Sequence, residues 1–335
     1  MRAVVCTPGS AEVTDIPDPR PGVGEVVVEV DACGLCGSDV HAVARGFARP
    51  GQILGHEFSG HIVESGPGVP GWREGQPVAV NPLGSCRACR ACGAGLPFRC
   101  EKVPNLGITA PGAYAEYVAV PQSQLVALPN GLPTELGAHA EPLAVALQAV
   151  SQANVGAGDA VLVYGIGPIG LSVIMALRLA GAGHIAAAGR SAGRRAAAAA
   201  VGANDVIDTR ELSVTQYAQQ TGLRFAAVLE CSGAPGSFAE ALDVLEPGGS
   251  CVEVGLTAET AAVPLPRLVG DGLRLAGTCA FSYPVYEAAV DHIAAGRVPV
   301  TALISERVSL DDTPAALTRL REPGDLVRVL TRPNQ

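Results

Sequence analysis

The sequence predicts an α/β protein of two domains, one of them mostly β and the other built on a doubly wound parallel sheet. Residues 1–147 read as short β-branched runs broken by Pro and Gly, which is typical of an irregular β domain. Residues 148–280 instead alternate short apolar strands with Ala-rich helical stretches, which indicates βαβ units on a parallel sheet. At 335 residues the chain is long enough for two domains that each bury their own core.

The first domain is expected to be discontinuous. Its clearest strands are Glu25–Val30 and Gln76–Val80, and after Phe281 the pattern predicts a helix at Val285–Ala295 followed by similar short strands and turns. We therefore predict that residues 1–147 and 281–335 form a catalytic domain, and that residues 148–280 form a nucleotide-binding domain inserted into it. The strands expected in the inserted domain are Ala160–Tyr164, His184–Ala188, Ala226–Glu230 and Ser250–Val254.

Composition and charge exclude several classes of protein. With 48% hydrophobic and 16% charged residues, the chain is too apolar to be disordered. Its net charge of −9 disfavours a nucleic-acid partner, which would need a basic surface. The sequence shows no apolar stretch of membrane-spanning length and no export signal at its start. We therefore expect a cytoplasmic protein that binds small molecules.

Ten cysteines in such a chain point to metal or redox chemistry rather than to disulfides. Four of them follow the pattern C-x2-C-x2-C-x7-C in a loop rich in Gly and Pro: Cys86, Cys89, Cys92 and Cys100. This spacing lets one loop present four thiolates to a tetrahedral ion, so it predicts a structural zinc site that leaves no position for substrate. The cysteines expected to be small core residues are Cys6, Cys33, Cys231, Cys251 and Cys279.

A second group of candidate ligands lies earlier in the chain. It combines Cys36 in CGLCGSDVH with His56 and Glu57 in GHEFSG. A thiolate, an imidazole and a carboxylate at long spacing suit a catalytic zinc site that keeps one position open for substrate.

At these residues the chain resembles the medium-chain zinc alcohol dehydrogenases. Gly55-His56-Glu57, followed by Gly60, Gly66 and Val69, match that family's zinc signature at its spacing, and the loop of four cysteines matches its structural-zinc lobe. The resemblance runs from the first strand to roughly residue 330. It implies a GroES-like catalytic domain and a Rossmann dinucleotide-binding domain. It also implies Cys36 and His56 as zinc ligands, with Ser38 and His41 as a proton relay.

The sequence does not determine which residue is the third protein ligand of the catalytic zinc. Where the branch of the family known for ethanol oxidation has a cysteine, this chain has Glu141 in AEPLAVALQAV, as in the sorbitol and polyol dehydrogenase branch. The resemblance allows Glu141 to bind the metal directly, or Glu57 to bind it while Glu141 holds a water on it. A simpler alternative is that Glu141 only begins a helix, where the helix dipole favours a carboxylate and Pro142 fits the first turn.

A nucleotide-binding loop is predicted in the second domain. An apolar strand ending at Tyr164 is followed by the turn GIGPIG and by a helix at Leu171–Ala180, which is the setting that makes G-x-G-x-x-G informative. The glycines allow a tight turn and a close approach of the backbone to a pyrophosphate, whose charge meets the helix N-terminus. The candidate cofactor contacts are Gly165, Gly167, Pro168, Ile169, Gly170 and, at a later strand end, Gly255.

The end of the next strand favours NADP over NAD. An NAD enzyme places an Asp or Glu there to bind the ribose hydroxyls, but this strand ends in Gly189-Arg190-Ser191, with Arg194 and Arg195 one turn later. Hydroxyl and guanidinium donors suit a 2′-phosphate. NAD stays possible, because Arg is the usual basic residue of this chain and these side chains could simply be solvated.

The predicted activity is hydride transfer between a nicotinamide cofactor and a secondary alcohol or its ketone, with zinc as the Lewis acid. A polyol, a sugar or an aminocyclitol-like alcohol fits best. One alternative is a primary-alcohol or aldehyde reductase of the same family, against which Glu141 argues. Another alternative is an NADPH-binding protein that zinc stabilises but that catalyses no reaction. Binding alone would need neither Ser38 nor His41. The resemblance also implies a homodimer or a homotetramer.

Overall fold

The structure is a computed structural model that describes residues 1–257, 260–322 and 324–335. It divides into two compact units: the first unit contains Met1–Glu141 and Phe281–Gln335, and the second unit contains Pro142–Ala280. The division at Glu141 falls inside helix α3 (Ala140–Ala153), a few residues before the boundary expected at residue 147. The sequence of α3 has no Gly and no internal Pro beyond its first turn, so no local signal marks this division.

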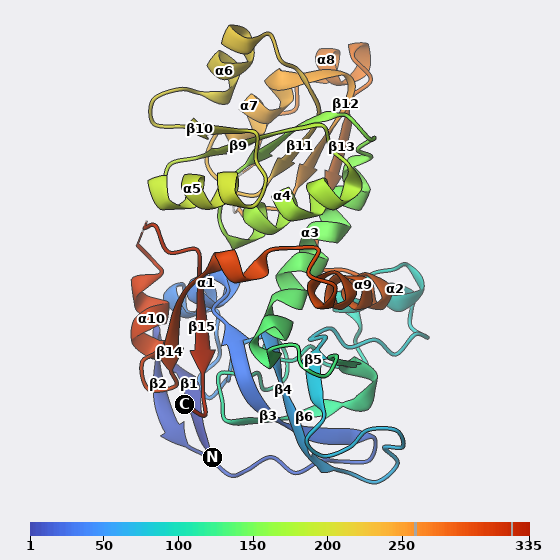
Figure 1. The fold of residues 1–335 in the computed structure, drawn as a ribbon, viewed down its shortest axis with the longest axis vertical. Helices are drawn as coiled ribbons and strands as arrows, with labels where there is room; N and C mark the ends of the chain where they lie inside the picture. The colour runs from blue at the N-terminus through green and yellow to red at the C-terminus, as the bar shows by residue number, and fades with distance from the viewer. Residues whose placement is uncertain (258–259, 323) are drawn as a thin grey trace. The chain divides into compact units, whose positions relative to one another are not determined.

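The second unit is an open parallel sheet. Its described strands are β8 (Ala160–Tyr164), β9 (His184–Gly189), β10 (Asp205–Asp208), β11 (Phe225–Glu230), β12 (Leu245–Glu253) and β13 (Arg274–Gly277). Across the sheet they lie in the order β10-β9-β8-β11-β12-β13, and all neighbouring pairs are parallel (Figure 1). The strand order reverses between β8 and β11, which is where open α/β sheets bind ligands. The predicted doubly wound parallel sheet is thus confirmed.

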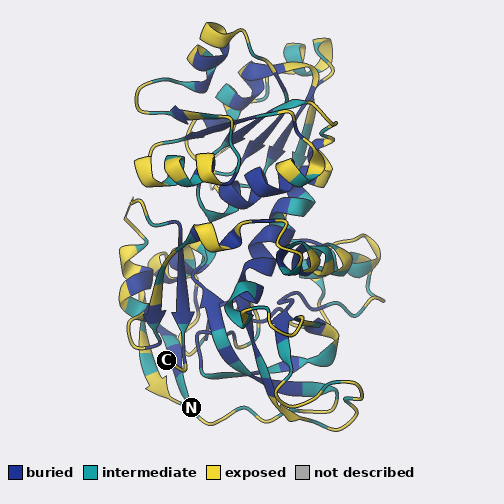
Figure 2. Ribbon diagram, in the orientation of Figure 1, coloured by how far each residue is buried: buried dark blue, intermediate teal, exposed yellow. Residues whose placement is uncertain are grey.

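Helices connect the strands of the second unit. They are α4 (Pro168–Ala180), α5 (Ala192–Ala200), α6 (Val214–Thr221), α7 (Ser237–Val244) and α8 (Leu265–Gly270). Helix α4 begins with Pro168 in its first turn and ends at Gly181, whose φ of 83° gives the left-handed cap that favours glycine. Figure 2 shows the strands of this sheet largely buried and α5 largely exposed, as expected for apolar strands and a helix rich in Ala and Arg.

The first unit is mostly β, as predicted. Its described strands are β1 (Arg2–Thr7), β2 (Ser10–Asp15), β3 (Glu25–Gly34), β4 (Glu57–Ser65), β5 (Pro77–Val80), β6 (Tyr117–Pro121), β7 (Leu125–Ala127), β14 (Ile304–Ser309) and β15 (Arg328–Arg332). Strands β1 and β2 form a hairpin, and the larger sheet has the order β14-β15-β3-β4-β5-β7, with β6 paired to β3. The C-terminal strand β15 therefore lies beside β3 from the start of the chain.

Short helices complete the first unit. They are α1 (Gly37–Ala44), α2 (Arg90–Gly93), α9 (Tyr283–Ala294) and α10 (Thr313–Arg319), with 3-10 turns η1 (Pro97–Arg99), η2 (Gln122–Gln124), η3 (Thr134–His139) and η4 (Val300–Leu303). Within the described residues, none of the helices has the length and apolar character needed to cross a membrane.

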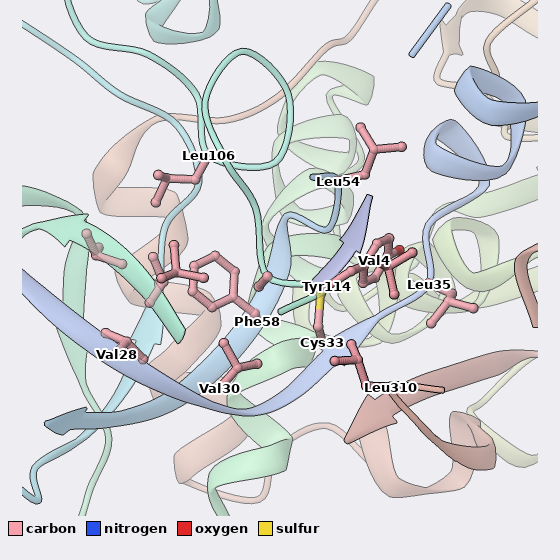
Figure 3. Close-up of a cluster of buried hydrophobic side chains, with 14 of the residues drawn as sticks. Val4, Val28, Val30, Cys33, Leu35, Leu54, Phe58, Leu106, Tyr114 and Leu310 are labelled. Carbon is pink, nitrogen blue, oxygen red and sulfur yellow. The ribbon is translucent and has the colours of Figure 1, made fainter. Parts of the chain in front are cut away.

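A buried apolar cluster fixes the part of the first unit that carries the candidate ligands. It joins Val28, Val30 and Cys33 of β3 to Phe58 of β4 and to Leu35, which follows β3 (Figure 3). Burial of side chains of this size contributes about 1.5–3 kcal/mol each. The loop between β3 and α1 and the start of β4 are therefore held by a packed core.

Candidate active site

Three predicted zinc ligands lie together in the first unit. Cys36 is the N-cap residue of α1. Glu57 is the first residue of β4, and His56 directly precedes it. The antiparallel pairing of β3 with β4 sets Gly34 opposite Glu57, which brings the two sequence motifs to the same place. One ligand atom from each of Cys36, His56 and Glu57 lies within 4.8 Å of the other two. We call these three residues the Cys36 cluster.

Asp39 positions the imidazole of His56. Its carboxylate Oδ1 lies 3.3 Å from His56 Nδ1, and its Oδ2 accepts a hydrogen bond of 2.7 Å from the hydroxyl of Tyr114. With Nδ1 facing Asp39, Nε2 is left for Cys36 or a metal, the arrangement that a carboxylate behind a ligating histidine provides. Burial lowers the pKa of His56, but the charges of Asp39 and Cys36 outweigh it and raise that pKa well above its ordinary value.

Arg328 holds the carboxylate of Glu57. The guanidinium NH2 lies 2.6 Å from Glu57 Oε2, and both side chains are almost fully buried, with exposed fractions of 1% and 2%. The same nitrogen donates to the carbonyl of Ala138 at 2.8 Å. Since a buried carboxylate without a partner is very costly, the contact with Arg328 stabilises the placement of Glu57 in the Cys36 cluster.

Glu141 adds another buried carboxyl group. Among the described residues, however, it does not belong to the group whose ligand atoms all lie within 4.8 Å of one another, which contains Cys36, His56 and Glu57. Burial and the charge of Glu57 raise the pKa of Glu141 to about 8, and burial and Glu57 also raise the pKa of Cys36. In both groups burial is the larger cause, and the charge of Glu57 adds to it, so each negative charge here needs a nearby cation. A thiol, an imidazole and carboxyl groups in a buried place of this kind fit a zinc ion.

Ser38 and His41, predicted as a proton relay, both lie on α1. The Ser38 hydroxyl donates to Cys36 Sγ at 3.2 Å, so it lies at the edge of the Cys36 cluster. His41 is exposed one turn further along the helix. The two side chains thus lead from the cluster toward solvent.

The predicted cysteine lobe, residues 86–100, brings its four thiols together. One ligand atom from each of Cys86, Cys89, Cys92 and Cys100 lies within 4.8 Å of the others. Backbone N–H groups point at these sulfurs: Cys86 N lies 3.4 Å from Cys100 Sγ, and Cys89 N lies 3.3 Å from Cys86 Sγ. Burial raises the pKa of Cys100, but backbone N–H donors from Lys102, Cys86 and Val103 lower it to about 6. The hydroxyl of Ser85 also lowers the pKa of Cys92, whereas side-chain hydrogen bonds among the thiols raise that of Cys89. Four thiols in one group, two of which favour thiolate, fit a closed tetrahedral zinc.

In the second unit, the loop after β8 has the geometry expected for a nucleotide site. Gly165 has a φ of 96°, which favours glycine, and a Cβ on Gly170 would lie 1.9 Å from the carbonyl oxygen of Gly165. Gly167, the N-cap of α4, has nothing within 4 Å of the position of a Cβ. The loop therefore packs tightly against the helix but leaves open space at the helix N-terminus, which fits a pyrophosphate.

The end of β9 differs in one respect from the sequence-based expectation. Ser191 caps α5 and its hydroxyl accepts from Arg194 N at 3.2 Å, while Arg190 is exposed. Arg195, however, lies 2.8 Å from Asp208 at the end of β10, in an ion pair whose two side chains are 17% and 13% exposed. Its guanidinium is therefore already bound to the protein.

Gly189 has no room for a larger residue. A Cβ at this position would lie 2.2 Å from Cγ1 and 2.6 Å from Cδ1 of Ile166. The place where an acidic ribose-binding side chain would begin is thus filled by a residue of the glycine-rich loop.

A buried carboxyl group, that of Glu230, and a half-buried one, that of Glu253, lie side by side where β11 and β12 end. Glu230 pairs in register with Glu253, and its oxygens accept from the backbone N–H groups of Ser232 and Gly233 at 2.9 Å each. Burial and the charge of Glu230 raise the pKa of Glu253 to about 7. Gly255, predicted as a cofactor contact, lies beside this pair and donates to the carbonyl of Glu230 at 2.9 Å.

The shifted pKa of Glu253 predicts a pH-dependent stability. Because folding raises this pKa from 4.5 to about 7, the neutral acid is the stabilised form, and stability is lost as the pH rises between these values. We expect Glu253→Gln to raise the free energy of unfolding by about 1 kcal/mol near pH 8, after discounting for partial exposure, and to leave it unchanged near pH 4. Chemical denaturation at the two pH values measures this. The exposed Glu246 of the same strand provides the control, Glu246→Gln, and an equal gain at both pH values would contradict the prediction.

Sequence reasoning missed Asp39, Tyr114, Arg328 and Asp208 as parts of the candidate sites. It was also wrong for two of the five cysteines expected in the core, since Cys279 is exposed and Cys231 is only partly buried. Cys231 and Cys279 follow the ends of β11 and β13, where the chain leaves the sheet.

Known protein families, relatives and structures match this chain along nearly its whole length. Residues 22–130 match the family described as the alcohol dehydrogenase GroES-like domain, and residues 168–295 match the one described as zinc-binding dehydrogenase. L-threonine 3-dehydrogenase from Chelativorans sp. (strain BNC1) is 30% identical over 323 residues, which cover 93% of each protein. A solved structure described as a zinc-binding dehydrogenase from Sinorhizobium meliloti 1021, bound to NADP, is 32% identical with a TM-score of 0.93 and covers 99% of both chains. The structure of 2R,3R-butanediol dehydrogenase from Bacillus subtilis is 30% identical with a TM-score of 0.90, again over 99% of both chains.

Proposed function

The chain belongs to the zinc-dependent medium-chain alcohol dehydrogenase family, and from this membership we propose that it interconverts a secondary alcohol and its ketone with NADP. Membership makes it an oxidoreductase that acts on a CH–OH group. The observation that carries the proposal is the Cys36 cluster, in which a thiol, an imidazole and a carboxylate lie within 4.8 Å of one another.

We assign a catalytic zinc to Cys36, His56 and Glu57, with Glu141 beside them. Bound there, zinc would act as a Lewis acid on the alcohol or ketone oxygen while the nicotinamide accepts or donates the hydride. Asp39 fixes the tautomer of His56, because its carboxylate faces Nδ1. Arg328 fixes the rotamer of Glu57 through a contact of 2.6 Å. The grouping of ligand atoms supports Glu57 rather than Glu141 as the third protein ligand.

Ser38 and His41 would move the proton of the substrate hydroxyl. During oxidation Ser38 Oγ would take this proton at the edge of the cluster while giving up its own toward solvent, and the exposed imidazole of His41, one turn further along α1, would accept that proton and release it to water. In the reverse direction the same atoms return a proton to the ketone oxygen. His41 is suited to this role because its imidazole is exposed to water and has two nitrogens that can donate or accept a proton.

The cysteine lobe is proposed as a structural zinc site. Its four sulfurs would fill the four positions of a tetrahedral zinc, so none would be left for a substrate. The lobe would therefore contribute to stability and not to the reaction.

The substrate is proposed to be a secondary alcohol with a neighbouring polar group, such as a polyol, a sugar or an aminocyclitol. Threonine at carbon 3 and 2,3-butanediol, named in two of the relatives, both carry secondary hydroxyl groups of this kind. NADP is proposed over NAD because β9 ends in Gly189-Arg190-Ser191 without an acidic residue, and because one similar structure holds NADP. A cytoplasmic location and a homodimeric or homotetrameric state stay predictions.

Initial rates of nicotinamide reduction test the proposal. The full-length, zinc-loaded protein is assayed with NADP and then NAD against polyols, cyclitols, simple secondary alcohols and primary alcohols, with and without a zinc chelator. Turnover of secondary alcohols that is faster with NADP and is lost with the chelator supports it. Preference for primary alcohols, or chelator-resistant turnover, overturns the proposed chemistry. Tight NADPH binding without turnover of any substrate favours the non-catalytic alternative.

A further inference from the structure

The ends of β9 and β10 are tied together by one ion pair. The two strands are parallel, and Asp208 lies in register with Gly189, the residue at which β9 ends. Arg195, from the first turns of α5, reaches across this end: its NH2 lies 2.8 Å from Asp208 Oδ2, and its NH1 donates to the carbonyl of Arg190 at 2.7 Å and to that of Gly189 at 3.3 Å. One guanidinium thus binds a carboxylate and two carbonyls of the turn after β9.

Both oxygens of Asp208 are occupied. Besides Arg195, the guanidinium of Arg210 donates to Asp208 Oδ2 at 2.6 Å and to Oδ1 at 3.0 Å, and the backbone N–H of Arg210 donates to Oδ1 at 3.1 Å. The hydrogen bonds from Arg210 and the charges of both arginines lower the pKa of Asp208, so it stays ionised at any working pH. A carboxylate engaged in this way does not offer acceptors to a ribose, as the acidic residue of an NAD site does.

The pair also determines which groups the turn can present to an anion. Carbonyl oxygens repel a phosphate, whereas N–H groups and guanidinium groups attract it. Because Arg195 binds the carbonyls of Gly189 and Arg190, these oxygens are directed toward the guanidinium. The N-cap of α5 at Ser191 and the exposed Arg190 are then the groups of the turn that can attract a phosphate.

We propose that Asp208 is a positioning residue that determines dinucleotide specificity: it holds Arg195 against the turn after β9, and the turn thereby keeps the conformation that receives the 2′-phosphate of NADP. This rests on the proposed use of NADP. It assigns Arg195 a structural task at this site in place of the direct phosphate contact expected from the sequence. The specificity of the turn then depends on a carboxylate that does not itself touch the cofactor.

Fluorescence titration of the full-length, zinc-loaded protein with NADPH and with NADH tests this inference. Asp208→Asn keeps the size of the side chain but removes the charge that holds Arg195. It should weaken NADPH binding by about tenfold and leave the NADH dissociation constant within about twofold. Arg195→Met should have the same selective effect, and the double variant should bind NADPH no more weakly than either single variant, because both changes break one interaction.

The matched control is Asp243→Asn in the same unit, where the carboxylate pairs with Arg267 on the surface and should not affect either dinucleotide. Thermal midpoints of all variants are measured alongside. Equal weakening of NADPH and NADH by Asp208→Asn would show a merely structural role, and unchanged or tighter NADPH binding would show that Asp208 does not support the phosphate site. Either result overturns the inference. Since binding is measured without turnover, failure to oxidise any alcohol would count against the proposed function alone.

Discussion

Replacing His56 with alanine is expected to abolish turnover while the protein stays folded. The imidazole is buried, lies within the Cys36 cluster and is held by Asp39, so its loss removes one of three proposed protein ligands of the catalytic zinc. A Lewis acid contributes several kcal/mol to such a reaction, so the loss in kcat should be at least about 10³-fold. Initial rates measure the loss, and elemental analysis should show zinc falling from two ions per chain to one.

His292→Ala is the matched control for this experiment, because His292 lies on α9 outside the Cys36 cluster. It should keep the parental rate and both zinc ions. Circular dichroism of the two variants should show the same secondary structure as the parent. A His56→Ala protein with the parental rate and full zinc content would mean that this cluster is not the catalytic metal site.

Replacing Cys89 with serine should affect stability far more than chemistry. The cysteine lobe contains the short helices α2 and η1, with no buried residue in either, so the proposed zinc would be the main source of its stability. Without the fourth thiolate the lobe should lose its zinc. We expect heat inactivation to be on the order of tenfold faster, while the rate of freshly prepared enzyme at low temperature stays within a few-fold of the parent.

Cys279→Ser provides the control for the cysteine lobe, since Cys279 is exposed and is not one of its four thiols. It should retain two zinc ions and the parental half-life on warming. If Cys89→Ser kept both zinc ions and the same half-life, the structural-zinc assignment would fail. If instead it lost activity at low temperature with its catalytic zinc in place, the lobe would have a role in the reaction.

The features that could be predicted from the sequence are those set by local patterns. Strand β8 was found at its observed bounds, because an apolar run that ends at a glycine-rich turn has few other structures. The four cysteines of the lobe are close in sequence, so their spacing alone indicates that they can meet. The pairing of Cys36 with His56 came from resemblance and not from spacing.

The missed residues depend on strand pairing, which local patterns do not determine. Arg328 reaches Glu57 only because β15, from the end of the chain, pairs with β3, and nothing in the local sequence of either strand specifies this register. Asp208 was missed for the same reason, because its role depends on the parallel pairing of β10 with β9, which sets Asp208 opposite Gly189. For Asp39 the sequence does carry a signal. An acidic residue stands next to Val40 in a short helix whose valines are buried, and an acidic side chain on that face needs a partner.

The contact between Ile166 and Gly189 limits how this lineage could change its cofactor by single mutations. An aspartate at position 189 is the obvious first step toward NAD, but its Cβ would lie 2.2 Å from Ile166 Cγ1, so the side chain of Ile166 would have to move within the glycine-rich loop. A smaller residue at position 166 would remove this overlap. The effect of an aspartate at position 189 therefore depends on the residue at position 166, and the two positions are expected to change together.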